Sequence, residues 1–179
     1  KAGDWSFWRT PMSEAAGRTM GIVGFGRIGR RLGELAAAFR MKVLANDVYR
    51  GNAPAYPFEW RGIPELFADA DVISLHVPLV DSTRNLFNAT RIAAMKRGAV
   101  LINTARGGIV DEVALAASLK SGQLGGAAID VFGHEPLPAS EHFKDCPNLL
   151  LTPHIAGVSA ESNERVSFLI AEKVLEALQ

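Results

Sequence analysis

Arg106, Glu135 and His154 are residues whose types and spacing suggest catalysis. Each follows a short apolar run. "AVLINTA" directly precedes Arg106, "AAIDVF" ends three residues before Glu135, and "LLLTP" directly precedes His154. Arginine offers a planar fork that binds a carboxylate bidentately, and histidine can take and return a proton near neutral pH. A glutamate can orient that imidazole and stabilise its charge. Together these residues suit the oxidation of an alcohol that lies beside a carboxylate.

A glycine motif nearer the N-terminus predicts a phosphate-binding turn. "GFGRIG" places Gly24, Gly26 and Gly29 in the G-x-G-x-x-G spacing, after an apolar run and at the start of an amphipathic stretch. Gly24 permits the tight turn, Gly26 lets a pyrophosphate approach the backbone, and Gly29 lets the helix pack closely on the strand. The next apolar run ends in Asp47, whose carboxylate would accept hydrogen bonds from the adenosine ribose. We therefore predict NAD rather than NADP, although Arg50 could partly offset the repulsion of the extra phosphate.

Short apolar runs alternate with helix-like stretches, and these elements must position the residues above. Such runs fit strands buried on both faces of a sheet, and they occupy 19–24, 41–47, 70–78, 98–105, 125–132 and 148–153. Helix-like patterns cover 26–39, 111–120 and 159–178. The alternation predicts an α/β fold with a doubly wound parallel sheet of the Rossmann type, which binds ligands beyond the carboxyl ends of its strands. We expect 51–64 to be a connection with one short strand, and 133–148 an irregular loop.

Composition and charge narrow the classes of partner. The chain of 179 residues is 48% apolar, enough for one domain with a sizeable core, and 19 Lys and Arg balance 19 Asp and Glu. No excess charge attracts nucleic acid or an anionic membrane, and no apolar run approaches the ~20 residues of a spanning helix. Cys146 is alone, which excludes an internal disulfide and fits a reducing compartment. We expect a cytoplasmic protein that binds a small molecule, with no metal, membrane or nucleic acid as partner.

Five segments, taken in order, are far more specific than the glycine motif: "VGFGRIG", "DVISLHVPL", "LINTARGGIVDE", "GAAIDVFGHEPLP" and "LTPHIAG". With them the chain resembles, over almost its whole length, the D-isomer-specific 2-hydroxyacid dehydrogenases, which include phosphoglycerate, glycerate and D-lactate dehydrogenases. The resemblance implies that Arg106 anchors the substrate carboxylate, that His154 is the general acid and base, and that Glu135 is its partner. The implied reaction transfers a hydride between NAD(H) and C2 of a D-2-hydroxy acid or 2-oxo acid.

The same resemblance implies a set of cofactor contacts. Arg27 and Ile28 would meet the pyrophosphate, beside Gly24, Gly26 and Gly29. Asp47 would meet the ribose, and the remaining contacts would line the cleft or flank the nicotinamide: Val77, Pro78, Thr83, Thr104, Ala105, Arg106, Asp130, His154 and Ala156.

Some polar residues have weaker or alternative interpretations. The carboxylate of Asp130 could accept from the nicotinamide carboxamide, and its alternative role is a structural cap. We assign no catalytic role to His76, and we expect His134 and His142 to be solvated loop residues.

The resemblance also bears on domain organisation. In this family the cofactor domain is inserted within a second, substrate domain, so we expect residues 1–179 to be the NAD-binding domain of a longer enzyme. Residues 1–17, with "DWSFW" at 4–8, would belong to a connecting segment, and 159–179 would form a connecting helix. The family's cofactor domains form the dimer interface, which implies a homodimer. Without a substrate domain, such a fragment should bind NAD yet turn over poorly.

One alternative function stays open at this point. The family includes transcriptional corepressors in which NAD(H) binding controls assembly with partners, and these relatives keep a similar set of residues. Retention of Arg106, Glu135 and His154 therefore does not separate the two functions. No extended partner-binding tail is recognisable in the sequence, which favours the dehydrogenase.

Overall fold

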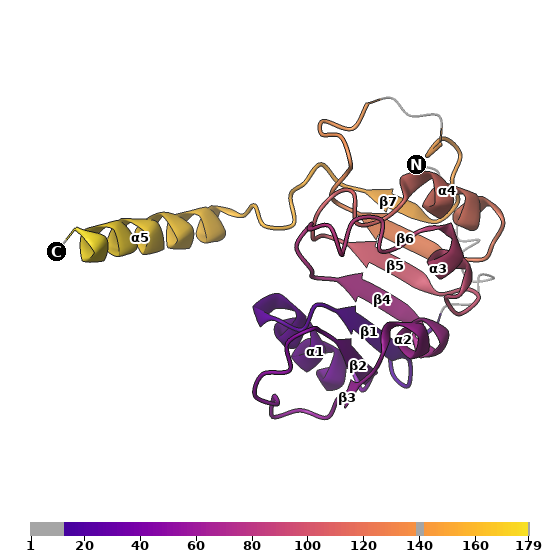
Figure 1. Ribbon diagram of the computed structural model, residues 1–179, viewed down its shortest axis with the longest axis horizontal. Helices are drawn as coiled ribbons and strands as arrows, with labels where there is room; N and C mark the ends of the chain where they lie inside the picture. The colour runs from indigo at the N-terminus through magenta and orange to yellow at the C-terminus, as the bar shows by residue number, and fades with distance from the viewer. Residues whose placement is uncertain (1–12, 139–141, 179) are drawn as a thin grey trace, which may run out of the picture.

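Seven parallel strands form one sheet in this computed structural model, which describes residues 13–138 and 142–178. The order across the sheet is β3-β2-β1-β4-β5-β6-β7 (Figure 1). The strands are β1 (Thr19–Val23), β2 (Lys42–Asn46), β3 (Glu59–Trp60), β4 (Val72–Leu75), β5 (Val100–Asn103), β6 (Gly126–Ile129) and β7 (Leu149–Leu151). The predicted doubly wound parallel sheet is confirmed. From β1 the chain adds strands first towards β3 and then, from β4 onwards, on the opposite side. Such sheets bind ligands at the point between β1 and β4 where this direction changes.

The helices within the described residues are α1 (Arg27–Ala38), α2 (Ile63–Asp69), α3 (Ala89–Ala93), α4 (Glu112–Lys120) and α5 (Ala160–Ala177). Three of them, α1, α4 and α5, match the predicted helices. Helices α2 and α3 were not predicted, since helices of 7 and 5 residues complete too few turns to show a helical period. The expected loop is confirmed, because the described parts of 133–148 contain no helix or strand.

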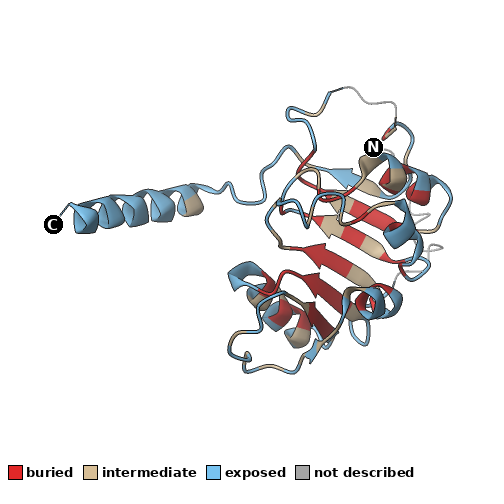
Figure 2. Ribbon diagram, viewed as in Figure 1, coloured by how far each residue is buried: buried red, intermediate tan, exposed pale blue. Residues whose placement is uncertain are grey.

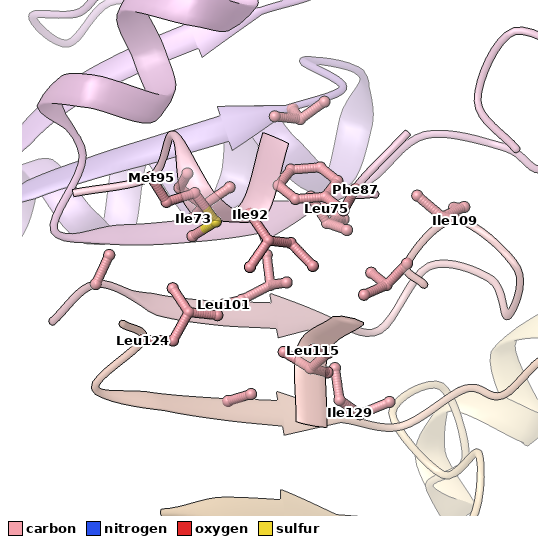
Figure 3. Packing of buried hydrophobic residues seen from close by; sticks show 14 of the residues in the cluster. Ile73, Leu75, Phe87, Ile92, Met95, Leu101, Ile109, Leu115, Leu124 and Ile129 are labelled. Atoms are coloured by element: carbon pink, nitrogen blue, oxygen red, sulfur yellow. The ribbon is translucent and has the colours of Figure 1, made fainter. Parts of the chain in front are cut away.

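Each face of the sheet carries an apolar cluster. The larger cluster lies where α2, α3 and α4 cover the sheet, and Ile73, Leu101 and Leu115 are buried in it (Figure 3). The smaller cluster lies where α1 packs on β1 and β2, and it contains Ile22 and Ala36. Figure 2 shows how burial follows the central strands. These buried strands fix the positions of the polar residues that follow their carboxyl ends.

Helix α5 differs from the rest of the fold because it projects away from the sheet (Figure 1). None of its residues is buried, and Figure 2 shows it exposed along nearly its whole length. Large apolar side chains on it are open to solvent, including Phe168, Ile170 and Leu175. Among the described residues, no helix has both the length and the apolarity to cross a membrane. Residues 1–12, which contain "DWSFW", lie outside the described residues.

Candidate active site

The glycine turn begins where β1 ends. Gly24 has a φ of +94°, and a Cβ there would overlap the backbone of His76, so a larger residue would be both strained and crowded. A Cβ on Gly29 would overlap the carbonyl oxygen of Gly24, which is why α1 can approach β1 so closely. The corresponding position on Gly26, the N-cap of α1, is open space. This geometry matches the conformational roles predicted for Gly24 and Gly29, and the approach of a phosphate to Gly26 stays a prediction.

Asp47, at the end of β2, ties the glycine turn to the loop that follows β2. Its Oδ2 accepts a hydrogen bond from the Phe25 amide at 2.6 Å, and its Oδ1 accepts one from the Tyr49 amide at 2.9 Å. The carboxylate lines a hollow of about 350 Å³ at the N-terminus of α1. Arg50 does not face this hollow as a free charge, since its guanidinium stacks over the Trp60 ring at 5.3 Å. Asp47 thus shares this hollow with Arg27 and Arg30, whereas Arg50 does not line it.

A second hollow, of about 460 Å³, lies along the carboxyl ends of β4, β5 and β6. Its walls include nine of the predicted cofactor residues: Ile28, Val77, Pro78, Thr104, Ala105, Arg106, Asp130, His154 and Ala156. Thr83, for which a contact was also predicted, is not among the lining residues. Its hydroxyl donates to the Pro78 carbonyl and accepts from the Val80 amide. His76 and Gly157 line it although no cofactor contact was predicted for either. The position of His76 directly after β4 was the signal that could have identified it.

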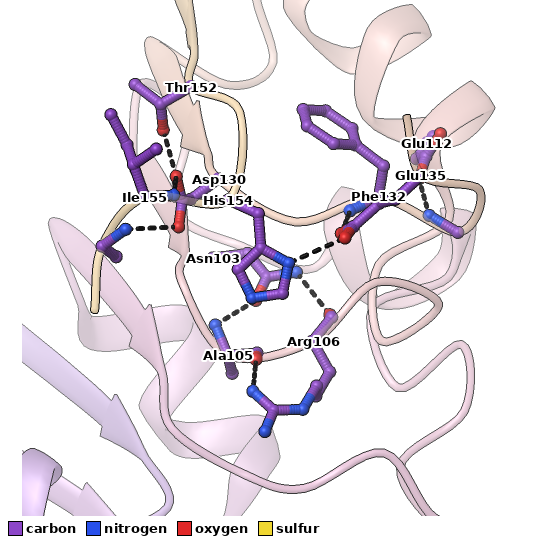
Figure 4. A network of polar contacts seen from close by, with 12 residues as sticks. Asn103, Ala105, Arg106, Glu112, Asp130, Phe132, Glu135, Thr152, His154 and Ile155 are labelled. Atoms are coloured by element: carbon purple, nitrogen blue, oxygen red, sulfur yellow. Dashed lines mark hydrogen bonds and ion pairs between the residues drawn. The ribbon is translucent and has the colours of Figure 1, made fainter. Parts of the chain in front are cut away.

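Glu135 and His154 face each other (Figure 4). His154 lines this cleft, and both residues line an adjoining hollow of about 680 Å³. The Oε2 atom of Glu135 lies 2.7 Å from Nδ1 of His154, and its Oε1 accepts from the Phe132 amide at 2.9 Å. The hydrogen bond with His154, followed by that from Phe132, holds the pKa of Glu135 below its ordinary value. An anionic carboxylate on Nδ1 selects the tautomer in which Nδ1 carries the proton. The other ring nitrogen, Nε2, is then available to exchange a proton with a ligand.

Asp130 holds the turn that presents His154, which has a φ of +54°. Its Oδ1 accepts from the Thr152 hydroxyl at 2.5 Å and the Ile155 amide at 2.9 Å, and its Oδ2 accepts from the Ala156 amide at 2.9 Å. Burial alone would raise the pKa of this carboxyl, but these hydrogen bonds outweigh it and the pKa is lowered. The contacts match the alternative role of structural cap. A nicotinamide contact remains a prediction that would use the remaining lone pair on Oδ2.

Arg106 lies in the loop after β5 and lines the same cleft as His154. Asn103, the buried last residue of β5, accepts from the Ala105 amide at 3.1 Å and donates to the Arg106 carbonyl at 3.0 Å. The Arg106 guanidinium donates through Nη1 to the Ala105 carbonyl at 2.6 Å. No salt bridge joins Arg106 to an acidic residue in the part of the chain that the structure describes. Most of its fork is therefore available to an anion, and Asn103 is a positioning residue that the sequence analysis missed.

The other histidines differ from one another. Burial lowers the pKa of His76, whose Nε2 lies 3.0 Å from the Ser74 hydroxyl, so this wall of the cleft stays uncharged near neutral pH. His134 is exposed, as expected. The expectation for His142 was wrong: its side chain is only 28% exposed, its ring packs at 4.4 Å on Phe143, and its Nε2 lies 3.5 Å from Glu112. The contact with the adjacent Phe143 ring therefore shields the His142 side chain from solvent although it lies in a loop.

Comparisons with known proteins agree with this geometry. The solved structure of D-2-hydroxyisocaproate dehydrogenase superposes with a TM-score of 0.91 at 30% identity and covers 99% of this chain and 58% of that one. D-lactate dehydrogenase from Aquifex aeolicus, complexed with NAD and lactic acid, gives 0.85 at 34% identity and covers 95% and 56%. The (S)-sulfolactate dehydrogenase of Chromohalobacter salexigens is 46% identical over an alignment of 183 positions, which covers 99% of this chain and 58% of that protein.

The chain thus spans a little over half the length of these relatives. A family model described as "D-isomer specific 2-hydroxyacid dehydrogenase, NAD binding domain" matches residues 1–156. The family inferred from the five sequence segments is thereby confirmed. This chain belongs to the NAD-binding domain family of the D-isomer specific 2-hydroxyacid dehydrogenases.

Proposed function

We propose that this chain is the cofactor-binding part of an enzyme that transfers a hydride between NAD(H) and C2 of a D-2-hydroxy acid or 2-oxo acid. The observation that carries the proposal is the 2.7 Å contact between Glu135 and His154, because His154 lines the same cleft as Arg106. A proton-transfer group and a carboxylate-binding group on one cleft are what this reaction needs beside a hydride carrier.

In this proposal the chain's own residues supply binding and proton transfer. Arg106 holds the substrate carboxylate through charge-assisted hydrogen bonds, which orients C2 in the cleft. The bound cofactor would supply the hydride to C2 as NADH in reduction and would accept it from C2 as NAD⁺ in oxidation. His154 gives a proton from Nε2 to the 2-oxo oxygen, and in oxidation it takes that proton back from the hydroxyl. The Glu135 carboxylate stabilises the protonated imidazole and keeps its ring in place.

The cofactor would extend across both hollows. The N-terminus of α1 with Arg27 and Ile28 would hold the pyrophosphate, because free amides and the helix dipole attract anions there. Asp47 would accept from the ribose hydroxyls and repel the extra phosphate of NADP. Thr104, Ala105 and the remaining lone pair of Asp130 would flank the nicotinamide, which puts its ring near His154.

We also propose that the chain is one domain of a longer, homodimeric enzyme. The share of the relatives that it spans and the uncovered apolar side chains of α5 both support this organisation. Under this proposal α5 returns to a substrate domain, which would close the cleft and exclude water. Sedimentation of the full-length protein measures the oligomeric state, and a monomer at micromolar concentration would contradict the dimer.

The corepressor alternative receives no support from the relatives reported above, which are dehydrogenases by name. The test is NADH oxidation by the full-length protein with glyoxylate, hydroxypyruvate, pyruvate and phosphohydroxypyruvate. Rapid turnover of one acid is the expected result and names the substrate class. If NADH binds tightly while no acid is reduced, the NAD(H)-sensing function becomes the better account.

A further inference from the structure

Glu112 is an acidic residue close to the candidate active site that the proposed mechanism does not use. It is the first residue of α4, and its side chain is only 20% exposed. Its Oε1 accepts a hydrogen bond from the Gly133 amide at 2.7 Å (Figure 4). Its Oε2 lies 3.5 Å from Nε2 of His142, an atom that is itself buried. One carboxylate thus contacts the chain on both sides of Glu135.

The amide that Glu112 holds is adjacent to the amide that holds Glu135. Gly133 donates to Glu112, and Phe132 donates to Glu135 at 2.9 Å. The two N–H groups lie in consecutive peptide planes, which meet at the Cα atom of Phe132. A displacement of the Phe132–Gly133 peptide that broke the contact with Glu112 would also move this shared Cα atom, and with it the donor that faces Glu135. The anchoring of Glu112 is therefore transmitted to the carboxylate beside His154.

Two further contacts fix this arrangement to the loop that carries Arg106. A Cβ on Gly107 would overlap the carbonyl oxygen of Phe132, so the two loops meet backbone to backbone. Asp111 caps α4 by accepting from the Ala114 amide at 3.0 Å, which sets where the helix and its first residue begin. The short segment from Arg106 to Glu112 therefore begins with the residue proposed to bind the substrate and ends with Glu112, which accepts from the Gly133 amide of the loop that carries Glu135.

We propose that Glu112 is a positioning residue that holds the Phe132–Gly133 peptide so that Glu135 stays on Nδ1 of His154. The proposal rests on the roles given to Glu135 and His154 under the proposed function. Under this proposal, substrate binding by Arg106 and proton transfer by His154 depend on the same segment. The helix that follows the Arg106 loop also sets the position of Glu135 beside His154.

The experiment compares Glu112→Ala, Glu112→Gln and a matched control, Glu65→Ala, in the full-length protein. Glu65 also lies in the first turn of a helix, α2, so its removal changes the same helix-terminus charge away from the cleft. We expect Glu112→Ala to lower kcat for 2-oxo acid reduction about 10- to 100-fold, the scale for misplaced catalytic groups, with the Kd of NADH unchanged. Glutamine keeps an oxygen for the Gly133 amide, so Glu112→Gln should recover most of kcat.

A second readout does not depend on turnover. The His154 Nδ1 proton, held by a carboxylate at 2.7 Å, should give a downfield, exchange-protected proton resonance that Glu135→Gln and His154→Asn remove. We expect Glu112→Ala to lose this resonance, and Glu112→Gln and Glu65→Ala to retain it. The proposal is overturned if Glu112→Ala keeps the resonance, or if glutamine and alanine at 112 behave alike. A wild-type protein that reduces no acid would refute the proposed function, while the resonances would still decide the role of Glu112.

Discussion

The two hollows that we propose to hold the cofactor are built differently. We call the hollow at the N-terminus of α1 the adenosine end and the hollow at the carboxyl ends of β4, β5 and β6 the chemical end. The adenosine end comes from one stretch of chain, in which the glycine turn, the start of α1 and Asp47 follow each other within β1, α1 and β2. The chemical end combines loops after β5, β6 and β7, which meet only because parallel strands place their carboxyl ends along one edge. Backbone geometry dominates the first end and side-chain hydrogen bonding the second. Substitutions should therefore affect cofactor binding at one end and turnover at the other.

The largest effect should follow from His154→Ala. Loss of the proton-transfer group should lower kcat about 100- to 10,000-fold, the usual share of general acid–base catalysis. The Kd of NADH, measured by fluorescence titration, should remain nearly unchanged because the adenosine end is intact. His134→Ala is the matched control, since this exposed histidine lies on the neighbouring loop. Near-normal turnover of His154→Ala would remove His154 from the mechanism.

Arg106→Ala should separate substrate binding from cofactor binding. Charge-assisted hydrogen bonds contribute about 1.5–3 kcal/mol each, so the loss of one should lower kcat/KM for a 2-oxo acid roughly 10- to 150-fold. The Kd of NADH should again be unchanged. Arg84→Ala, which removes an exposed arginine from a different loop, provides the control. A large loss of NADH affinity in Arg106→Ala would mean that the arginine serves the cofactor instead.

The difference between the two ends also explains how much the sequence could predict. Gly24, Gly29 and Asp47 lie on adjacent elements with fixed spacing, so a motif predicts both their positions and their conformational roles. Arg106, Glu135 and His154 were identified because each follows an apolar run, and the sheet brings them together as expected. The anchors around them, Asn103 and Glu112, could not be predicted from the sequence alone. Their contacts depend on where separate loops meet, which neither spacing nor periodicity records.

Asp130→Asn tests whether the carboxylate that caps the His154 turn contributes to stability. Asparagine has one side-chain oxygen, so it cannot accept from both the Ile155 and the Ala156 amide as Asp130 does. The free energy of unfolding at pH 7 should therefore fall by about 1–3 kcal/mol, the cost of lost hydrogen bonds to a buried charged group. The pKa of Asp130 is lowered in the folded state, so its contribution is present above the unfolded value near ~3.9 and is lost as pH falls through the folded value. Urea unfolding of both proteins between pH 7 and pH 3 measures this. Parallel stability curves across that range would argue against the cap.

Asp47→Asn probes cofactor choice at the adenosine end. Neutralising the carboxylate removes the repulsion of a second phosphate and weakens the ribose contact, so the ratio of the NADPH to the NADH dissociation constant should fall about tenfold. Asparagine keeps one oxygen for the Phe25 or Tyr49 amide, which limits damage to the turn. Titration with both nucleotides gives the ratio directly. Wild-type protein that bound NADPH as tightly as NADH would refute the predicted preference.

The smallest effect should come from Arg50→Ala, which decides whether this cation takes part in cofactor choice. Its guanidinium stacks on Trp60 rather than lining the hollow beside Asp47, so we expect the NADPH to NADH ratio to stay as in the wild type. Loss of the stacking should lower the free energy of unfolding by about 0.5–1 kcal/mol, the range for an exposed cation–π pair. Denaturation and nucleotide titration of the same preparation separate the two quantities. A weaker affinity for NADPH alone would show that Arg50 leaves Trp60 to meet the extra phosphate, and the adenosine end would then depend on a mobile side chain as well as on its backbone.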